Sequence, residues 1–200
     1  MPLAREVEYW EDVSKHCVSD KGLIKDNVYK RPHQIRKLLD YDWIGQKVLE
    51  IGTGNAVVAG ALRLIVQGHF SYLGTELAEN FRKSAKAMFQ IETVQADVKE
   101  LPGEGYTRII AFDSLEHVRP QDRTDGYARI YSVAAKDALL FIHFSRSVSL
   151  HDPEFDHPFG LHDLQALEMA GFTLNRYDRY LCWNDESEEQ LDYVFVVMQK

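Results

Sequence analysis

The sequence is poor in cysteine, and its two cysteines are far apart. Cys17 and Cys182 have no CxxC spacing, so the sequence offers neither a zinc-binding pattern nor a disulfide framework. The first residues, MPLAREVEYWEDV, are charged throughout and contain no apolar signal-peptide core. The sequence also lacks any run of about 18 apolar residues, the length that indicates a membrane-spanning helix. We therefore expect a reduced, cytoplasmic protein without a membrane partner.

The chain also lacks an excess of positive charge. It carries a formal net charge of −8 over 200 residues, whereas binding to nucleic-acid phosphates needs a basic face. We therefore expect no nucleic-acid partner. The chain contains no internal repeat and no linker rich in Gly, Ser or Pro. Its length suits a single domain with a sizeable core.

From residue 46 onward, apolar strands alternate with amphipathic helices. Strands are predicted at 47–51, 71–75, 92–95, 107–112, 138–144, 172–181 and 191–198, and helices at 55–67, 78–89, 121–134 and 160–170. Apolar strands separated by helices indicate a parallel sheet covered on both faces. The segment between the last two strands is too short for a helical crossover, so these strands are predicted to form an antiparallel hairpin.

These patterns predict one α/β domain over residues 1–200. Residues 1–45 are predicted to form a helical cap, because apolar residues recur there at helical spacing. Residues 46–200 are predicted to form a Rossmann-like core. The core is expected to be a seven-stranded, mostly parallel sheet that ends in the antiparallel hairpin.

The segment VLEIGTGNAVVAG, residues 48–60, reads as a strand, a glycine turn and a helix. A phosphate-binding P-loop would close with Lys and Ser or Thr, but Ala59 and Gly60 stand there. The G-x-G-x-x-G fingerprint of NAD-binding folds lacks its third glycine. Glu50 would also face a pyrophosphate unfavourably. A carboxylate at this place suits a ligand such as S-adenosylmethionine, which carries a sulfonium and an ammonium group and no phosphate.

The segment VLEIGTGNAVVA resembles the first motif of the class I S-adenosylmethionine-dependent methyltransferases, E/D-x-G-x-G-x-G, with Ala56 in place of the last glycine. YLGTEL, VQADVKELP and RIIAFDSLEHV follow in order and resemble the second, third and fourth motifs. The resemblance spans residues 48–118, and the set of four motifs is similar to that of ubiquinone methyltransferases. The chain departs from many members in having AAKDALLFI where they have Pro-Gly-Gly before the fifth strand.

The resemblance implies S-adenosylmethionine as cofactor and suggests which residues bind it. Glu76 would accept hydrogen bonds from the ribose hydroxyls, and Asp97 would accept one from the adenine amino group. The fourth motif would lie under the methionine part. In this family, helices before the first strand often place an aromatic or basic residue at the cofactor carboxylate, for which Tyr29, Arg31 and His33 are candidates. The predicted cofactor-binding residues are Glu50, Gly52, Thr53, Gly54, Glu76, Leu77, Asp97, Val98, Asp113, Ser114 and Arg31.

Five of the eight histidines lie between residues 117 and 162, namely His117, His143, His151, His157 and His162. A hydroxyl acceptor benefits from a positioned base, and histidine is suited to neutral pH. We predict His117, His157 and Asp113 as catalytic residues. The acidic and histidine-rich segment 151–163 also suits a surface loop or a divalent metal site. Some relatives with the DSLEH motif have been associated with magnesium, which here would involve Asp113, Glu116 and His117. We predict no metal.

The reaction expected from these features is in-line methyl transfer to a hydroxyl of a small metabolite or a glycan. Two alternatives stay open at this point. One is transfer to an amine or a carboxylate, neither of which needs a strong base. The other is a catalytically silent, cofactor-binding partner subunit. The acceptor and the oligomeric state are not predicted.

Overall fold

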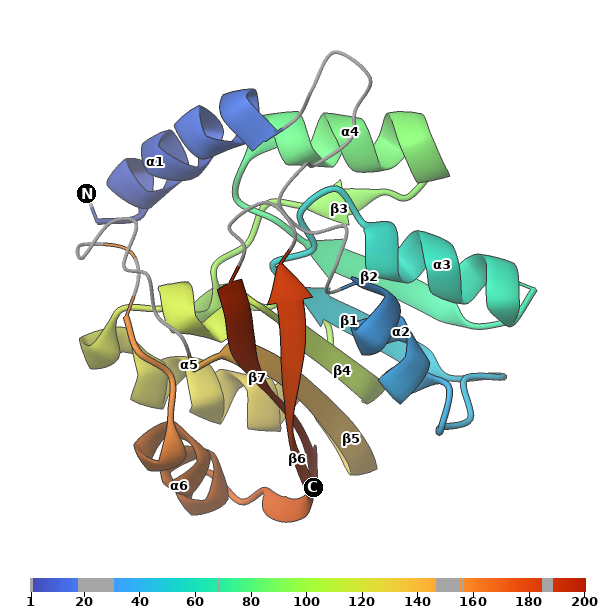
Figure 1. The fold of residues 1–200 in the computed structure, drawn as a ribbon, viewed down its shortest axis with the longest axis vertical. Coiled ribbons are helices and arrows are strands. Elements are labelled where there is room, and N and C mark those ends of the chain that lie inside the picture. Colours follow the sequence, from blue (N-terminus) through green and yellow to red (C-terminus); the bar gives the residue numbers. More distant parts are fainter. Residues whose placement is uncertain (1, 18–30, 68, 147–154, 156, 185–188) are drawn as a thin grey trace. The chain divides into compact units, whose positions relative to one another are not determined.

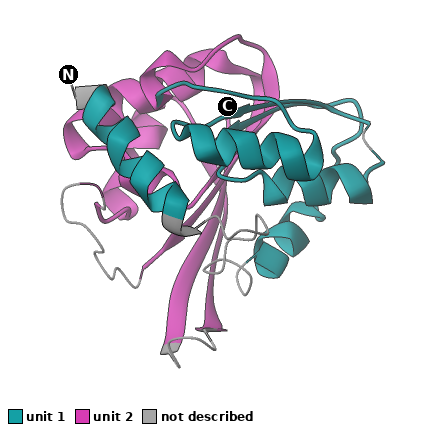
Figure 2. Cartoon of the chain, turned by 90° about the horizontal axis from the view of Figure 1, so that it is seen from above, with its two compact units in different colours: residues 1–97 teal, residues 98–200 magenta. Residues whose placement is uncertain are grey.

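The fold is described here from a computed structural model of the chain. The structure describes residues 2–17, 31–67, 69–146, 155, 157–184 and 189–200. The chain divides into two compact units, residues 1–97 and residues 98–200 (Figure 2). Each unit is described in turn.

The first unit contains the helices that precede the sheet and the first three strands. Its elements are α1 (Pro2–Cys17), α2 (Arg31–Leu38), β1 (Lys47–Ile51), α3 (Val57–Ile65), β2 (Ser71–Thr75), α4 (Glu79–Phe89) and β3 (Thr93–Val94). β1 pairs in parallel with β2, and β2 with β3. Four of the five residues of β1 are buried, as expected for an apolar strand inside a parallel sheet.

Ala56 explains how the chain keeps the glycine turn without the third glycine of the motif. Its backbone adopts the left-handed conformation, with φ 61°, just before α3 begins. An alanine pays steric strain in this region, where glycine does not. The Ala56 methyl group is fully buried in a cluster with Ala59, Ala85 and Ile91. Packing of this methyl group therefore offsets the strain.

α1 is attached to α4 through a carboxylate. Ala78, the residue before α4, offers no side-chain cap. The Glu11 carboxylate of α1 accepts the backbone N–H groups of Glu79 and Asn80 instead. A negative charge at a helix N-terminus is stabilising, because the first N–H groups have no partner within the helix.

The second unit contains the remaining strands and the two C-terminal helices. Its elements are η2 (Val98–Glu100), β4 (Tyr106–Phe112), η3 (Leu115–His117), α5 (Pro120–Val133), β5 (Ala134–Ser145), α6 (Leu161–Met169), β6 (Thr173–Asn184) and β7 (Glu189–Gln199). β4 and β5 are parallel, whereas β7 is antiparallel to both β5 and β6. The predicted C-terminal hairpin is therefore confirmed (Figure 1).

The strand order is β3-β2-β1-β4-β5-β7-β6 in one seven-stranded sheet. This order confirms the predicted fold class. Five strands differ from the predicted bounds. β3 is one residue shorter at each end, and β4 begins one residue earlier, at Tyr106. β5 begins at Ala134 rather than 138, because it follows α5 directly. β6 extends to Asn184 and β7 begins at Glu189, so both strands continue into the segment expected to connect them. The prediction of a single domain with a cap over residues 1–45 stays a prediction. Within the part of the chain that the structure describes, no helix has the length and apolar character of a membrane span.

Candidate cofactor site and acceptor side

The glycine turn after β1 is held open by backbone geometry. Gly52 and Gly54 have φ values of 66° and 54°, which glycine adopts without steric cost. Thr53, between them, donates its backbone N–H and its hydroxyl to the Thr75 carbonyl at 3.0 and 2.9 Å. Thr53 therefore positions the turn on the end of β2. A Cβ at Gly54 would meet no atom within 4 Å, so a ligand can approach the backbone closely there.

Glu76 connects the end of β2 to this turn. Its buried carboxylate accepts the Gly54 N–H at 2.8 Å and the Ala78 N–H at 3.0 Å, one on each oxygen. Burial raises the pKa of Glu76, while the N–H groups of Ala78, Gly54 and Leu77 oppose the increase. Each carboxylate oxygen can accept more than one hydrogen bond. Glu76 can therefore bind a diol such as ribose while it holds the turn.

Glu50 is a buried carboxylate on β1. It is 3% exposed and accepts a hydrogen bond of 2.7 Å from the Tyr72 hydroxyl. Burial raises the pKa of Glu50 to about 7, although the Tyr72 hydrogen bond and the charge of Arg31 act in the opposite direction. The pKa of Tyr72 is raised by burial and by the charge of Glu50. A cationic ligand group would therefore stabilise the charged form of Glu50.

The positive charge of Arg31, on α2, lowers the pKa of Glu50. Its Nη1 donates to Gln34 at 2.8 Å. A guanidinium and a carboxylate on one side of a site match the carboxylate and ammonium of an amino acid. The charge of Arg31 acts on Glu50, and both residues stay candidates for the cofactor site. His33 is exposed, and Tyr29 lies outside the described residues.

The remaining predicted cofactor residues lie at the ends of elements. The Leu77 carbonyl accepts hydrogen bonds from Arg82 at 2.6 Å and from Gln95 at 3.3 Å. Asp97 is partly buried at the end of the first unit, and the buried Val98 begins the second. These residues lie at strand ends and in loops, as the motifs predict.

On the second unit, Asp113 follows directly after β4 with φ 51°. Its backbone N–H donates to the His143 carbonyl at 2.9 Å, and its Oδ1 lies 2.7 Å from His143 Nδ1. The neighbouring Ser114 hydroxyl is buried and has no hydrogen-bond partner among the residues described. The left-handed backbone conformation of Asp113 therefore accompanies a side chain that contacts His143 of β5. The Ser114 hydroxyl is a second polar group next to Asp113 in the sequence.

Arg123 of α5 brings the segments of His117 and His157 together. The His157 N–H donates to the Glu116 carbonyl at 2.9 Å. The buried Arg123 guanidinium pairs with the buried Asp163 carboxylate at 2.9 Å. The same guanidinium also donates to the backbone carbonyls of Glu116, Val118, His157 and Pro158. This cluster, the Arg123 clamp, holds η3 against the chain that enters α6.

Histidine, cysteine and carboxylate side chains are the possible metal ligands of the described residues. No group of three or more His, Cys, Asp or Glu side chains in the described part of the chain could hold a metal ion. His162 and Asp163, from the histidine-rich segment, form a pair at 3.0 Å, and Asp163 also serves the Arg123 clamp. His151 lies outside the described residues, so the predicted role of the full segment stays a prediction.

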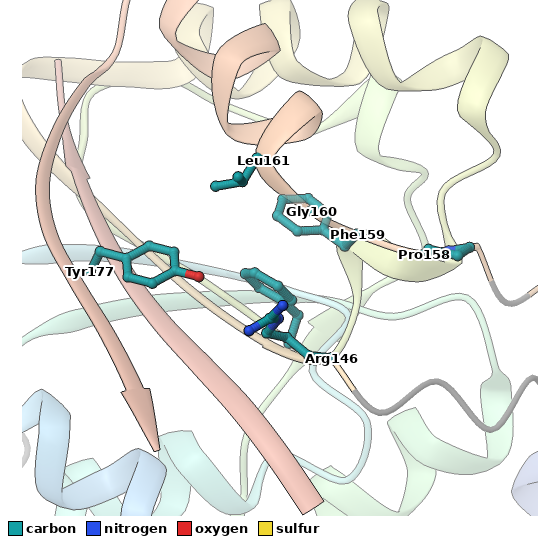
Figure 3. A pocket seen from close by; sticks show the side chains of 7 residues that line it. Arg146, Pro158, Phe159, Gly160, Leu161 and Tyr177 are labelled. Atoms are coloured by element: carbon teal, nitrogen blue, oxygen red, sulfur yellow. The ribbon is translucent and has the colours of Figure 1, made fainter. Parts of the chain in front are cut away.

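A separate pocket of about 430 Å³ lies beside α6 in the second unit (Figure 3). In this view the Arg146 side chain and the Tyr177 hydroxyl are directed toward the space beside α6. None of the predicted site residues is among its lining residues, which are Phe144, Arg146, Pro158, Phe159, Gly160, Leu161 and Tyr177. The pocket is therefore distinct from the predicted site.

Sequence reasoning missed Tyr72, Arg123 and Tyr180, and it singled out Asp163 only as one residue of the segment 151–163. Tyr72 could have been found, because parallel register places it near Glu50: the partner of Glu50 is Gly74, two residues further along β2. Arg123 and Asp163 are 40 residues apart, and no spacing in the sequence indicates their pairing. Tyr180 looks like one of several aromatic residues in a strand.

Comparisons with known proteins agree with this geometry. Residues 48–137 match a family model described as a methyltransferase domain. A magnesium protoporphyrin IX methyltransferase from Synechocystis with bound S-adenosylhomocysteine has a similar fold, with a TM-score of 0.75, 15% identity and coverage of 98% of this chain and 99% of that chain. A TehB-like SAM-dependent methyltransferase from Corynebacterium glutamicum has a TM-score of 0.66 and 18% identity, with coverage of 99% of this chain and 97% of that chain. A SAM-dependent methyltransferase from Archaeoglobus fulgidus has a TM-score of 0.67 and 17% identity, with coverage of 88% of this chain and 97% of that chain. No curated protein matches the sequence.

The strand order, the antiparallel hairpin and the glycine turn with its two carboxylates define a class I, Rossmann-like methyltransferase fold. The family match and the solved neighbours confirm the resemblance found in the sequence. Residues 48–137 therefore match a methyltransferase domain, and solved neighbours of the same fold are S-adenosylmethionine-dependent methyltransferases, one of them a structure with bound S-adenosylmethionine.

Proposed function

We propose that this methyltransferase transfers the methyl group to a hydroxyl of a small metabolite or a glycan. The observation that carries the proposal is the Arg123 clamp, which ties the segment of His117 to that of His157 just beyond Asp113 and β4. In open parallel sheets, ligands bind beyond the carboxyl ends of the strands. Two imidazoles and a carboxylate at such a place suit an acceptor that must lose a proton near neutral pH.

The residues of the first unit would hold the cofactor. Glu76 would accept the ribose hydroxyls, Arg31 would bind the methionine carboxylate, and Glu50 would bind the ammonium group. Gly52 and Gly54 would let the cofactor approach the backbone, while Thr53 keeps their turn in place. S-adenosylmethionine supplies an electrophilic methyl group when bound. The observations that support this fit are the open space at Gly54 and the raised pKa of Glu50, which a cation would reverse.

Two histidines of the second unit would hold the acceptor. His117 and His157 would accept hydrogen bonds from its hydroxyl and orient the oxygen toward the methyl carbon. Orientation of this kind supplies most of the catalysis in a direct displacement. Leu77, Asp97, Val98 and Ser114 remain proposed cofactor contacts on the strength of the motifs. A cytoplasmic location likewise stays a prediction.

The experiment has two arms. In the first, thermal melting is followed with S-adenosylhomocysteine, S-adenosylmethionine and NAD at about 100 times their expected dissociation constants, where a bound ligand adds roughly 2.7 kcal/mol. The two sulfur ligands should raise the melting temperature by roughly 5–10 °C, and NAD should not. In the second, formation of S-adenosylhomocysteine is measured with phenols, sugars, amines and carboxylic acids. Transfer to amines or carboxylates only would overturn the proposed acceptor class, and cofactor binding without any transfer would favour a silent subunit.

A further inference from the structure

Three side chains of the second unit form a continuous hydrogen-bonded chain. Asp113 Oδ1 lies 2.7 Å from His143 Nδ1, and His143 Nε2 lies 2.6 Å from the Tyr180 hydroxyl. His143 is completely buried, whereas the Tyr180 side chain is partly exposed. Asp113, at the other end, is also partly exposed, but a carboxylate has no proton to pass on, so the Tyr180 hydroxyl is the end at which a proton can be exchanged with an acceptor.

The fold brings these groups together from three strands or strand ends. His143 lies near the end of β5 and pairs with Phe195 of β7, and Tyr180 of β6 pairs with Tyr193 of β7. The Tyr180 side chain therefore spans β7 to reach β5. The Tyr193 ring stacks on His143, with 5.0 Å between ring centroids and 25° between planes. This stacking fixes the plane of the imidazole.

Aromatic rings surround His143 in the described part of the protein. The rings of Phe112 and Tyr193 pack on the imidazole. Among the described residues, the groups around this hydrogen-bonded series that can carry charge include Asp113 from the end of β4, Tyr180 and Cys182 from β6, and Tyr193 from β7. In a water-poor setting of this kind, a proton on His143 is stabilised chiefly by the Asp113 carboxylate.

The hydrogen-bond partners define the direction of the chain. A carboxylate only accepts hydrogen bonds, so the proton of the neutral imidazole lies on Nδ1 and points to Asp113. Nε2 then accepts a hydrogen bond from the Tyr180 hydroxyl. A carboxylate, an imidazole and a hydroxyl stand in the same order in Ser-His-Asp hydrolases, where the imidazole takes the hydroxyl proton. Here a phenol occupies the place of the serine.

We propose that the chain of Tyr180, His143 and Asp113 receives the proton of the acceptor hydroxyl, an inference that rests on the proposed O-methyl transfer. The acceptor proton passes to the Tyr180 oxygen while the original Tyr180 proton passes to His143 Nε2. The acceptor oxygen forms its bond to the methyl carbon as the carbon–sulfur bond breaks and leaves its electron pair on sulfur. The positive charge that sulfur loses thus appears on the imidazolium, which Asp113 stabilises.

The environment of Tyr180 agrees with a relay rather than with a resting tyrosinate. Burial and the charge of Asp113 raise the pKa of Tyr180, so the phenol is neutral before the reaction. A phenol that gains one proton as it loses another never carries a charge. In this scheme His117 and His157 orient the acceptor, and Tyr180 is the catalytic residue that touches it. His143 and Asp113 act through Tyr180.

The experiment compares two probe acceptors, phenol and the much more acidic 4-nitrophenol, at pH 8. Only phenol needs a base, because 4-nitrophenol is already largely ionised. We expect Tyr180→Phe to lower kcat with phenol by about 10²–10⁴-fold and to leave kcat with 4-nitrophenol nearly unchanged. Tyr177→Phe, on the same strand and exposed, is the matched control. Thermal shifts with S-adenosylhomocysteine report folding and cofactor binding for each variant.

A second measurement does not depend on activity. ¹⁵N NMR of the S-adenosylhomocysteine complex should show the His143 proton on Nδ1, and Tyr180→Phe should move the Nε2 resonance. Equal losses with both acceptors, or a His143 proton on Nε2 alone, would overturn the relay while leaving O-methyl transfer intact. If the wild-type protein methylates no hydroxyl acceptor although it binds the cofactor, the proposed function fails and the relay fails with it.

Discussion

The Glu50 carboxylate on β1 accepts a hydrogen bond of 2.7 Å from the Tyr72 hydroxyl on the neighbouring strand β2. This single neutral donor does not fully compensate burial, so the pKa of Glu50 is raised from 4.5 to about 7. The proposed cofactor site therefore contains a carboxylate that changes its charge near neutral pH.

The first prediction concerns stability. Between pH 4.5 and about 7 the folded protein holds the Glu50 proton and the unfolded chain does not, so the free energy of unfolding falls as the pH rises through this window. The full shift corresponds to about 3 kcal/mol. Glu50→Gln removes this dependence. Urea unfolding from pH 5 to 8 should show wild type losing stability relative to the variant, and a constant difference would contradict the prediction.

The second prediction concerns cofactor binding. The ammonium group of S-adenosylhomocysteine favours the charged form of Glu50, so binding below pH 7 should release a proton. Affinity should then rise by up to about tenfold per pH unit below the pKa and level off above it. Calorimetry in two buffers with different ionisation enthalpies measures the released proton. Glu50→Gln should release none. Proton release that survives in this variant would place the titrating group elsewhere.

The third prediction concerns Glu76, whose two oxygens hold the N–H groups of Gly54 and Ala78. Glu76→Gln keeps the size of the side chain but replaces one acceptor oxygen by a donor. Hydrogen bonds to charged groups contribute about 1.5–3 kcal/mol, so affinity for S-adenosylhomocysteine should fall by about 10–100-fold. Glu79→Gln, on the exposed surface of α4, is the control and should bind normally. Equal affinities for the two variants would exclude Glu76 from the cofactor site.

The fourth prediction concerns the Arg123 clamp. Arg123→Met would leave the buried Asp163 carboxylate without its guanidinium partner and would remove one hydrogen-bond donor from each of four backbone carbonyls. Breaking a buried ion pair costs about 3–5 kcal/mol, which corresponds to a decrease in melting temperature of roughly 6–20 °C. Lys136→Met, at an exposed position of β5, should melt like wild type. A stable Arg123→Met protein would show that the clamp is not needed for the fold.

The fifth prediction separates orientation from proton removal. His117→Gln and His157→Gln should lower turnover by similar factors with phenol and with 4-nitrophenol, because an orienting residue serves both acceptors. Affinity for S-adenosylhomocysteine should be unchanged in both variants. Steady-state kinetics with the two acceptors provides the measurement. A loss confined to phenol in the His117 variant would make His117 the base, and the Tyr180 relay would then be wrong.

The sequence predicts best those features that depend on residues within a single strand or turn. The strands β1 and β2 were predicted with their observed bounds, because short apolar runs between turn residues are local patterns. The glycine turn and Glu50 were likewise found from neighbouring residues. His143 was noticed only as one histidine among five, since its partners Asp113 and Tyr180 are 30 and 37 residues away. Such partners are defined by strand register and side-chain packing, which no local pattern reports.

The last prediction concerns close packing between α3 and α4. A Cβ added at Gly60 would lie 2.8 Å from Cγ and Cε1 of the Phe89 ring, closer than carbon atoms approach without displacement. Gly60→Ala gains about 1 kcal/mol of helix propensity, but overpacking typically costs about 1–3 kcal/mol. We therefore expect a net destabilisation in the wild-type background. In a Phe89→Ala background the ring is absent, so the same substitution should become stabilising by up to about 1 kcal/mol. Urea unfolding of the four proteins measures this coupling, and additive effects would show that the ring moves aside freely.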